Sequence, residues 1–209
     1  VNAISDVLGA GVKVLVDTGF LPLASILIEP AKILFLNNAI NFGVLAPIGA
    51  VEAEETGKSI MFMLESNPGP GLGLLVAFWL AGPKILRGSA PGAIVIHFLG
   101  GIHEIYFPYV LLKPIVVLAA IAGGATGVAT FAATGVGLVA TPSPGSIFAY
   151  MTMTPPGNHF GVLLGIALSA AVSFVVAFFI LKATGSGDDA ADLDAAKAKS
   201  ADMKSGTAN

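Results

Sequence analysis

Two histidines and a carboxylate interrupt an apolar stretch, residues 93–112, that is about long enough to cross a bilayer. They are His97, His103 and Glu104. An ionisable side chain at membrane depth is costly unless it faces protein or a water-filled cavity, which makes Glu104 a candidate functional residue. The pair Gly100-Gly101 lets the backbone leave a helix and approach a ligand closely. The stretch therefore predicts a binding site at a broken helix or a re-entrant hairpin.

Three amide side chains lie close together in an earlier apolar run, residues 33–48. Asn37 and Asn41 are four positions apart and would project from one face of a helix, with Asn38 beside them. These amides could hydrogen-bond to neighbouring helices. They could equally line a path for a sugar, because amides both donate to and accept from hydroxyls. The two interpretations stay open at this point.

A run rich in proline and glycine divides another candidate span, residues 59–81. The run is Glu65-Ser66-Asn67-Pro68-Gly69-Pro70-Gly71, which a continuous helix cannot contain. Half-helices that meet at unwound polar backbone are typical of transporter binding sites. An interfacial loop between two short spans is the alternative.

Further features predict where helices begin, pack and span. We expect a new helix to start at Pro30, because proline suits the first helical turn. Gly123 and Gly127 are spaced for close packing of two helices. Residues 147–153 are apolar but too short to span a bilayer, whereas residues 160–181 form the clearest span of the chain.

Composition places the chain among membrane proteins. It has 209 residues, of which 55% are hydrophobic and 11% charged, with a mean hydropathy of +0.87. Soluble domains carry about 25% charged residues. We therefore expect an all-α polytopic membrane protein with transmembrane helices and broken or re-entrant segments. The net charge is −3, and no part of the sequence resembles a basic patch that would bind nucleic acid.

Cysteine is absent, which excludes a thiol nucleophile, a thiolate metal site and a disulfide framework within this chain. We expect no cofactor and no metal ion. Residues 1–182 are interpreted as the membrane-embedded portion, and residues 183–209, which are small, polar and charged, as a flexible tail or linker. Basic residues flank three successive apolar segments and favour one cytoplasmic side for Lys84, Arg87, Lys113 and Lys182, hence a cytoplasmic tail.

Several of these motifs, in this order, resemble the enzyme IIC family, the membrane component of bacterial sugar phosphotransferase systems. The run Gly100-Gly101-Ile102-His103-Glu104 resembles the signature region of that family, in a spelling similar to its mannitol-specific branch. Supporting runs are residues 23–41, 65–71 and 143–146. The position after the amide cluster is often His in the family and is Phe42 here. The family's membrane domain also has additional N-terminal spans, so we expect this chain to correspond to its later part.

The resemblance implies a mannitol permease in the bacterial plasma membrane, surrounded by lipid and forming a homodimer. It implies that mannitol is phosphorylated at a terminal hydroxyl by a phosphocysteine on enzyme IIB, giving mannitol 1-phosphate. On this interpretation Glu104 orients the attacking hydroxyl and accepts its proton, and His103 positions the sugar or stabilises phosphoryl charge. The expected substrate-binding residues are Asn37, Asn38, Asn41, Glu65, Asn67, His103 and Glu104. The alternatives are an ion-coupled secondary transporter of sugars or polyols, which would use the same broken helices, and a truncated remnant that does not transport.

Overall fold

The computed structural model describes residues 2–184 and 190–207, and the regular elements within those ranges are helical. In chain order they are α1 (Asn2–Asp17), η1 (Leu21–Ala24), α2 (Ser25–Ile33), α3 (Asn37–Ile40), η2 (Asn41–Leu45), α4 (Ala46–Thr56), α5 (Met61–Leu64), α6 (Gly69–Ala81), α7 (Lys84–Arg87), α8 (Ala90–Ile94), η3 (Val95–Leu99), η4 (His103–Tyr106), α9 (Phe107–Leu112), η5 (Pro114–Val116), α10 (Val117–Thr134), α11 (Ile147–Met153), α12 (His159–Thr184) and α13 (Ala190–Thr207). The predicted all-α fold is confirmed.

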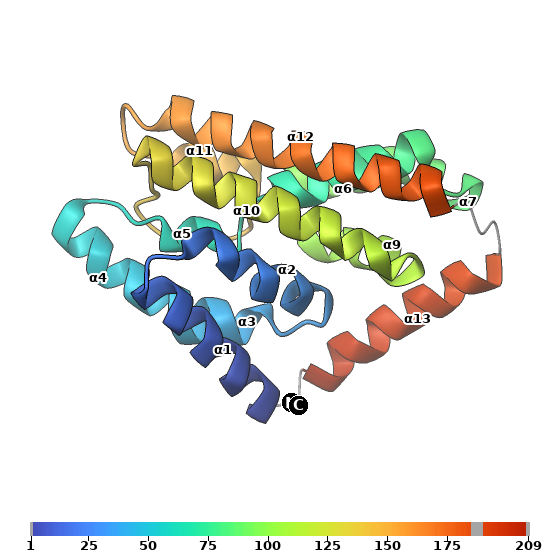
Figure 1. The fold of residues 1–209 in the computed structure, drawn as a ribbon, viewed down its shortest axis with the longest axis horizontal. Helices are drawn as coiled ribbons and strands as arrows, with labels where there is room; N and C mark the ends of the chain where they lie inside the picture. Colours follow the sequence, from blue (N-terminus) through green and yellow to red (C-terminus); the bar gives the residue numbers. More distant parts are fainter. Residues whose placement is uncertain (1, 185–189, 208–209) are drawn as a thin grey trace.

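Helices α6, α10 and α12 form the centre of the molecule, with α10 and α12 side by side along its length (Figure 1). Glycines allow this close approach. A Cβ at Gly123 would lie 2.7 Å from the backbone oxygen of Ser169, and one at Gly127 would lie 3.1 Å from the Ser169 Cβ. The predicted packing role of these two glycines is confirmed, because a side chain at either position would push α10 away from α12.

Two helical stretches are long and apolar enough to cross a membrane, Pro114–Thr134 and His159–Thr184. Their mean hydropathies are 2.0 and 2.6. The second contains the span expected over residues 160–181. The short apolar piece over residues 147–153 forms α11 and, as expected, does not reach spanning length.

The N-terminal elements α1 to α4 lie together beside this central group (Figure 1). The helix start expected at Pro30 is wrong, because α2 begins at Ser25 and continues through Pro30 to Ile33. The proline ring leaves the carbonyl of Ile26 without its helical donor, a local loss that the helix tolerates here. Beyond α2, the elements α3, η2 and α4 follow one another without a gap, with a π-helical turn over Asn41–Leu45.

Both predicted helix breaks are confirmed. The first separates α5, which ends at Leu64, from α6, which begins at Gly69. The second separates η3, which ends at Leu99, from η4, which begins at His103. A π-helical turn over Val95–Leu99 precedes this second break. Two of the predicted functional stretches therefore leave regular helix inside the folded chain.

The C-terminal stretch contains a helix that the sequence did not indicate. Residues 190–207 form α13, which packs against α9 and buries Ala196 and Ser200. Alanine and lysine are good helix formers, so a composition too polar to build a core can still be helical. This helix differs from the flexible tail expected there, while the division of the chain near residue 182 stays a prediction.

Candidate functional site

A polar cavity of about 150 Å³ lies where four separate stretches of the chain meet. One is the amide run of α3 and η2, two are the helix breaks, and the fourth is the loop over residues 141–145. A single water needs only about 10–15 Å³ of such space, so a larger polar molecule fits. Non-helical backbone at membrane depth is tolerated where it lines a cavity, and this cavity is lined by three non-helical segments.

The amide side of the cavity comes from α3 and the π-helical turn that follows. Asn37, Asn38 and Asn41 all line the cavity, and so does Phe42, whose side chain is 62% exposed. A π-helical turn rotates successive side chains relative to an α-helix and is frequent at functional sites. The sequence left a packing role and a lining role open for these amides, and their placement on the cavity wall favours the lining role.

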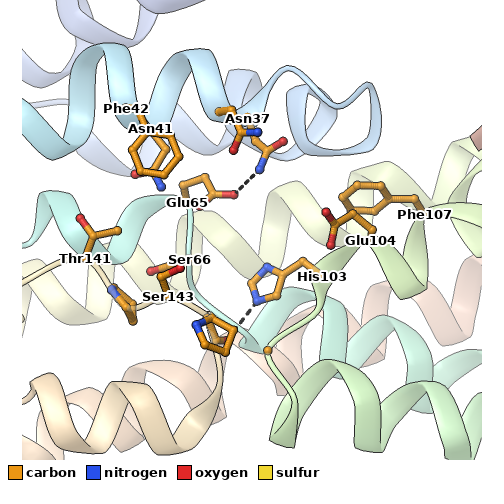
Figure 2. Close-up of a pocket in the computed structure, with 15 residues that line it drawn as sticks. Asn37, Asn41, Phe42, Glu65, Ser66, His103, Glu104, Phe107, Thr141 and Ser143 are labelled. Carbon is orange, nitrogen blue, oxygen red and sulfur yellow. Dashed lines mark hydrogen bonds between the residues drawn. The ribbon is translucent and has the colours of Figure 1, made fainter. Parts of the chain in front are cut away.

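Glu65 stands at the centre of the lining (Figure 2). It is the first residue after α5, it is 8% exposed, and its Oε1 accepts a hydrogen bond of 3.0 Å from Nδ2 of Asn37. Its backbone oxygen accepts from Nζ of Lys32 at 3.3 Å. Both ends of this residue are therefore held by side chains from the N-terminal helices.

Further side chains form hydrogen bonds with the first break and with the start of α6. The backbone oxygen of Pro68 accepts from Nε2 of His97 at 2.9 Å, and that of Pro70 accepts from Oγ of Ser173 at 2.7 Å. Ser66 donates to the oxygen of Phe62 at 2.6 Å and lies 2.7 Å from the hydroxyl of Tyr150. Buried backbone groups need such partners, so the open segment has a defined position.

The second break approaches the loop over residues 141–145. Gly101 has a φ of +75°, and a Cβ there would lie 2.6 Å from the backbone nitrogen of Ser146. Two residues later, Nε2 of His103 donates to the backbone oxygen of Gly145 at 3.1 Å. The ring of His103 also lies 4.6 Å from that of His97, measured between centroids. Gly101 thus allows the contact that brings His103 to the cavity.

Glu104 follows His103 and also lines the cavity, on the side where Phe107 lies (Figure 2). Its side chain is exposed, in contrast to that of Glu65. Thr141 and Ser143 contribute small polar groups from the loop. Together these residues offer amide, hydroxyl, imidazole and carboxylate groups to one space, an arrangement suited to a small ligand rich in hydroxyls.

Six of the seven predicted site residues line this cavity: Asn37, Asn38, Asn41, Glu65, His103 and Glu104. Asn67 is the exception. It is 1% exposed, its Oδ1 accepts from the backbone nitrogen of Gly69 at 2.9 Å, and its Nδ2 donates to Oγ of Ser169 at 3.1 Å. The amide therefore fixes the start of α6 against α12 and does not line the cavity.

Sequence reasoning missed several contributors. Ser66, Thr141 and Ser143 line the cavity, and their signal was available in the runs rich in proline, glycine and serine that contain them. Lys32 was missed because it ends the run Glu29-Pro30-Ala31-Lys32, which was interpreted only as a helix boundary. Within residues 2–184 and 190–207, no group of three or more His, Asp or Glu side chains is arranged to hold a metal ion.

Comparisons with known proteins extend these observations. The family model described as "Phosphotransferase system, EIIC" matches residues 18–124. The chain is 61% identical over 189 residues to the "PTS system mannitol-specific EIICB component" of Geobacillus stearothermophilus, covering 90% of this chain and 40% of that protein. It is 52% identical over 204 residues to the "PTS system mannitol-specific EIICBA component" of Escherichia coli K12, covering 98% of this chain and 32% of that protein. The chain thus spans less than half of these relatives, and no solved structure matches it.

Substituting Gly101 tests the contact between the second break and the loop. Gly101→Ala adds a strained left-handed residue, which costs about 1–2 kcal/mol, and a Cβ that meets the backbone of Ser146. Gly19→Ala is the matched control, since Gly19 has a φ of +78° and nothing within 4 Å of its Cβ position. We expect thermal unfolding in detergent to show a larger fall in Tm for Gly101→Ala. Equal falls for the two variants would contradict the close contact.

Proposed function

We propose that this chain, which belongs to the phosphotransferase system EIIC family, binds mannitol in the polar cavity and carries it across the bacterial plasma membrane as it is phosphorylated. The observation that carries the proposal is the meeting of Asn37, Asn38, Asn41, His103 and Glu104 at one cavity between interrupted helices. Membership of the family makes the chain a membrane component. Its relatives are named as mannitol-specific components, and these names indicate the substrate.

Mannitol is an uncharged polyol, so its binding site needs hydrogen-bond partners and no counter-charge. The amides of Asn37, Asn38 and Asn41 can each donate to one hydroxyl and accept from another. The carboxylate of Glu65 already accepts from Asn37 and has lone pairs left for a sugar hydroxyl. His103 supplies a ring nitrogen on the opposite side of the space (Figure 2).

For the chemical step, Glu104 accepts the proton of the terminal hydroxyl as that oxygen attacks the phosphorus of a phosphocysteine on enzyme IIB. The oxygen–phosphorus bond forms, the sulfur–phosphorus bond breaks, and the cysteine leaves as a thiolate. The cysteine must belong to enzyme IIB, because this sequence has none. The relatives support such a partner, since their names combine the C component with a B component. The exposed carboxylate of Glu104 suits a group that meets a second protein.

The orientation in the membrane follows from the basic residues. The start of α10 and the end of α12 lie at the same end of that helix pair, near α7 (Figure 1). Lys113, Lys182 and the α7 residues Lys84 and Arg87 therefore gather at one end. We assign this end, and with it residues 183–209, to the cytoplasm, where lysine and arginine are in excess. Residues 1–182 are then the lipid-embedded portion, and by resemblance to the family it pairs with a second copy.

The direct test is product formation by membranes that carry this chain together with enzyme IIB. We expect radiolabelled mannitol to become mannitol 1-phosphate only when enzyme IIB is phosphorylated. Accumulation of unmodified mannitol driven by an ion gradient would instead support a secondary transporter. If neither product nor uptake is detected, even when an N-terminal half from a relative is co-expressed, the result would support a remnant that does not transport.

Replacing the proposed base separates chemistry from binding. Glu104→Gln keeps the side-chain volume and an acceptor but cannot take a proton, so we expect phosphorylation to fall by about 10²–10⁴-fold while mannitol binding persists. The measurement is the rate of mannitol 1-phosphate formation beside equilibrium mannitol binding. Glu55→Gln, an exposed position on α4 outside the cavity, is the control. Normal turnover in Glu104→Gln would rule out the role of base.

Removing one amide tests the sugar contact. Asn38→Ala deletes donor and acceptor from the cavity wall, and we expect mannitol affinity to fall by about 0.5–1.5 kcal/mol, or about two- to tenfold. Asn158→Ala removes an amide whose Oδ1 accepts from Lys58 outside the cavity, at 2.8 Å. That control should bind mannitol as the parent does. Unchanged affinity in Asn38→Ala would return this amide to a packing role.

A further inference from the structure

A fully buried ion pair lies on α2, outside the cavity lining. Glu29 and Lys32 are each 1% exposed, and Nζ of Lys32 is 2.9 Å from both Oε1 and Oε2 of Glu29. Removing two charges from water is expensive, and replacing such a pair with well-packed neutral side chains is often neutral or stabilising. Stability alone is therefore a weak reason for these residues, and their other contacts become informative.

Lys32 makes one such contact, to the backbone oxygen of Glu65 at 3.3 Å. In a continuous helix that oxygen would accept from the backbone nitrogen of Gly69. Here Gly69 donates instead to the side chain of Asn67, at 2.9 Å. The carbonyl of Glu65 therefore has no helical donor at the break, and it accepts a hydrogen bond from the ammonium group of Lys32 instead.

Glu65 is held at its other end by Asn37, which donates to the carboxylate at 3.0 Å. The residue consequently spans two fixed points, Lys32 at the backbone and Asn37 at the cavity. Glu29 in turn fixes the ammonium group, and α10 approaches so closely that a Cβ at Gly124 would lie 3.0 Å from Oε1 of Glu29. The buried charge therefore has little freedom to move.

We propose that the Glu29–Lys32 pair is a positioning device for Glu65, which sets the place of that carboxylate in the cavity and so the affinity of the cavity for a polyol. The pair acts through Glu65 and touches no ligand itself. This inference rests on the proposed function for its affinity readout, and on geometry alone for a second readout that needs no sugar.

The test uses a double substitution, Glu29→Gln with Lys32→Met, which removes both charges of the pair at similar side-chain volume. The matched control is Asp17→Asn with Lys13→Met, which removes an exposed pair with a separation of 2.8 Å. We expect mannitol affinity to fall by about 10- to 100-fold in the buried double variant and to stay unchanged in the control. Thermal unfolding of both variants reports whether they fold.

A third variant keeps a donor in place of the charge. Glu29→Gln with Lys32→Gln leaves two amides that can hydrogen-bond to each other and to the oxygen of Glu65. We expect its affinity to lie between that of the parent and that of the Met variant. An affinity as low as that of the Met variant would overturn a role for the hydrogen bond to Glu65.

The second readout uses the absence of cysteine from the chain. Asn38→Cys with Ser66→Cys, at neighbouring positions of the cavity wall, keeps Asn37 and Glu65 intact and reports on the distance between α3 and the break through a short bifunctional thiol reagent. We expect the crosslink yield to fall by more than half when the Glu29→Gln/Lys32→Met pair is added. An unchanged yield overturns the positioning role whatever the affinity. If the parent bound no polyol while the yield still depended on the pair, the proposed function would fail and the positioning role would stand.

Discussion

Backbone groups that leave a helix at membrane depth must find other hydrogen-bond partners, and this requirement organises the structure. Within residues 65–70, the released backbone oxygen of Glu65 accepts from Lys32 on α2. Three other elements bond to the same segment: Tyr150 on α11 to the hydroxyl of Ser66, His97 on η3 to the oxygen of Pro68, and Ser173 on α12 to the oxygen of Pro70. Each contact ties a helix to the open segment. The break is therefore a junction that holds helices from distant parts of the chain in fixed positions relative to one another.

The cavity is a consequence of that junction. Once Glu65 is fixed between Lys32 and Asn37, the amides of α3 and η2 face the break, and the bond from His103 to Gly145 brings the second break to the same space. The long helices α10 and α12 contribute no lining residues. They hold the junction from outside through small residues such as Gly123 and Ser169. Packing and recognition are thus divided between different helices.

The sequence predicted the helix breaks and most of the lining because those features are local. Proline, glycine and a carboxylate within an apolar run leave few alternatives at Glu65 or Glu104. What it could not predict depends on contacts between distant residues. Asn67 has the same side chain as Asn37, yet it bonds to Gly69 and Ser169 and turns away from the cavity. The run Glu29-Pro30-Ala31-Lys32 indicated a helix boundary, and only the fold reveals that Lys32 lies against Glu65.

The most direct measurement asks whether this cavity is the place where mannitol binds. Ser143→Cys introduces a single thiol on the cavity wall of a chain that otherwise has none, and its rate of reaction with a small charged thiol reagent can be followed in membranes. The proposal predicts that the thiol reacts and that mannitol slows the reaction, while a thiol at Glu55, outside the cavity, reacts equally with and without mannitol. A Ser143→Cys rate that mannitol does not change, in membranes that bind mannitol, would contradict it.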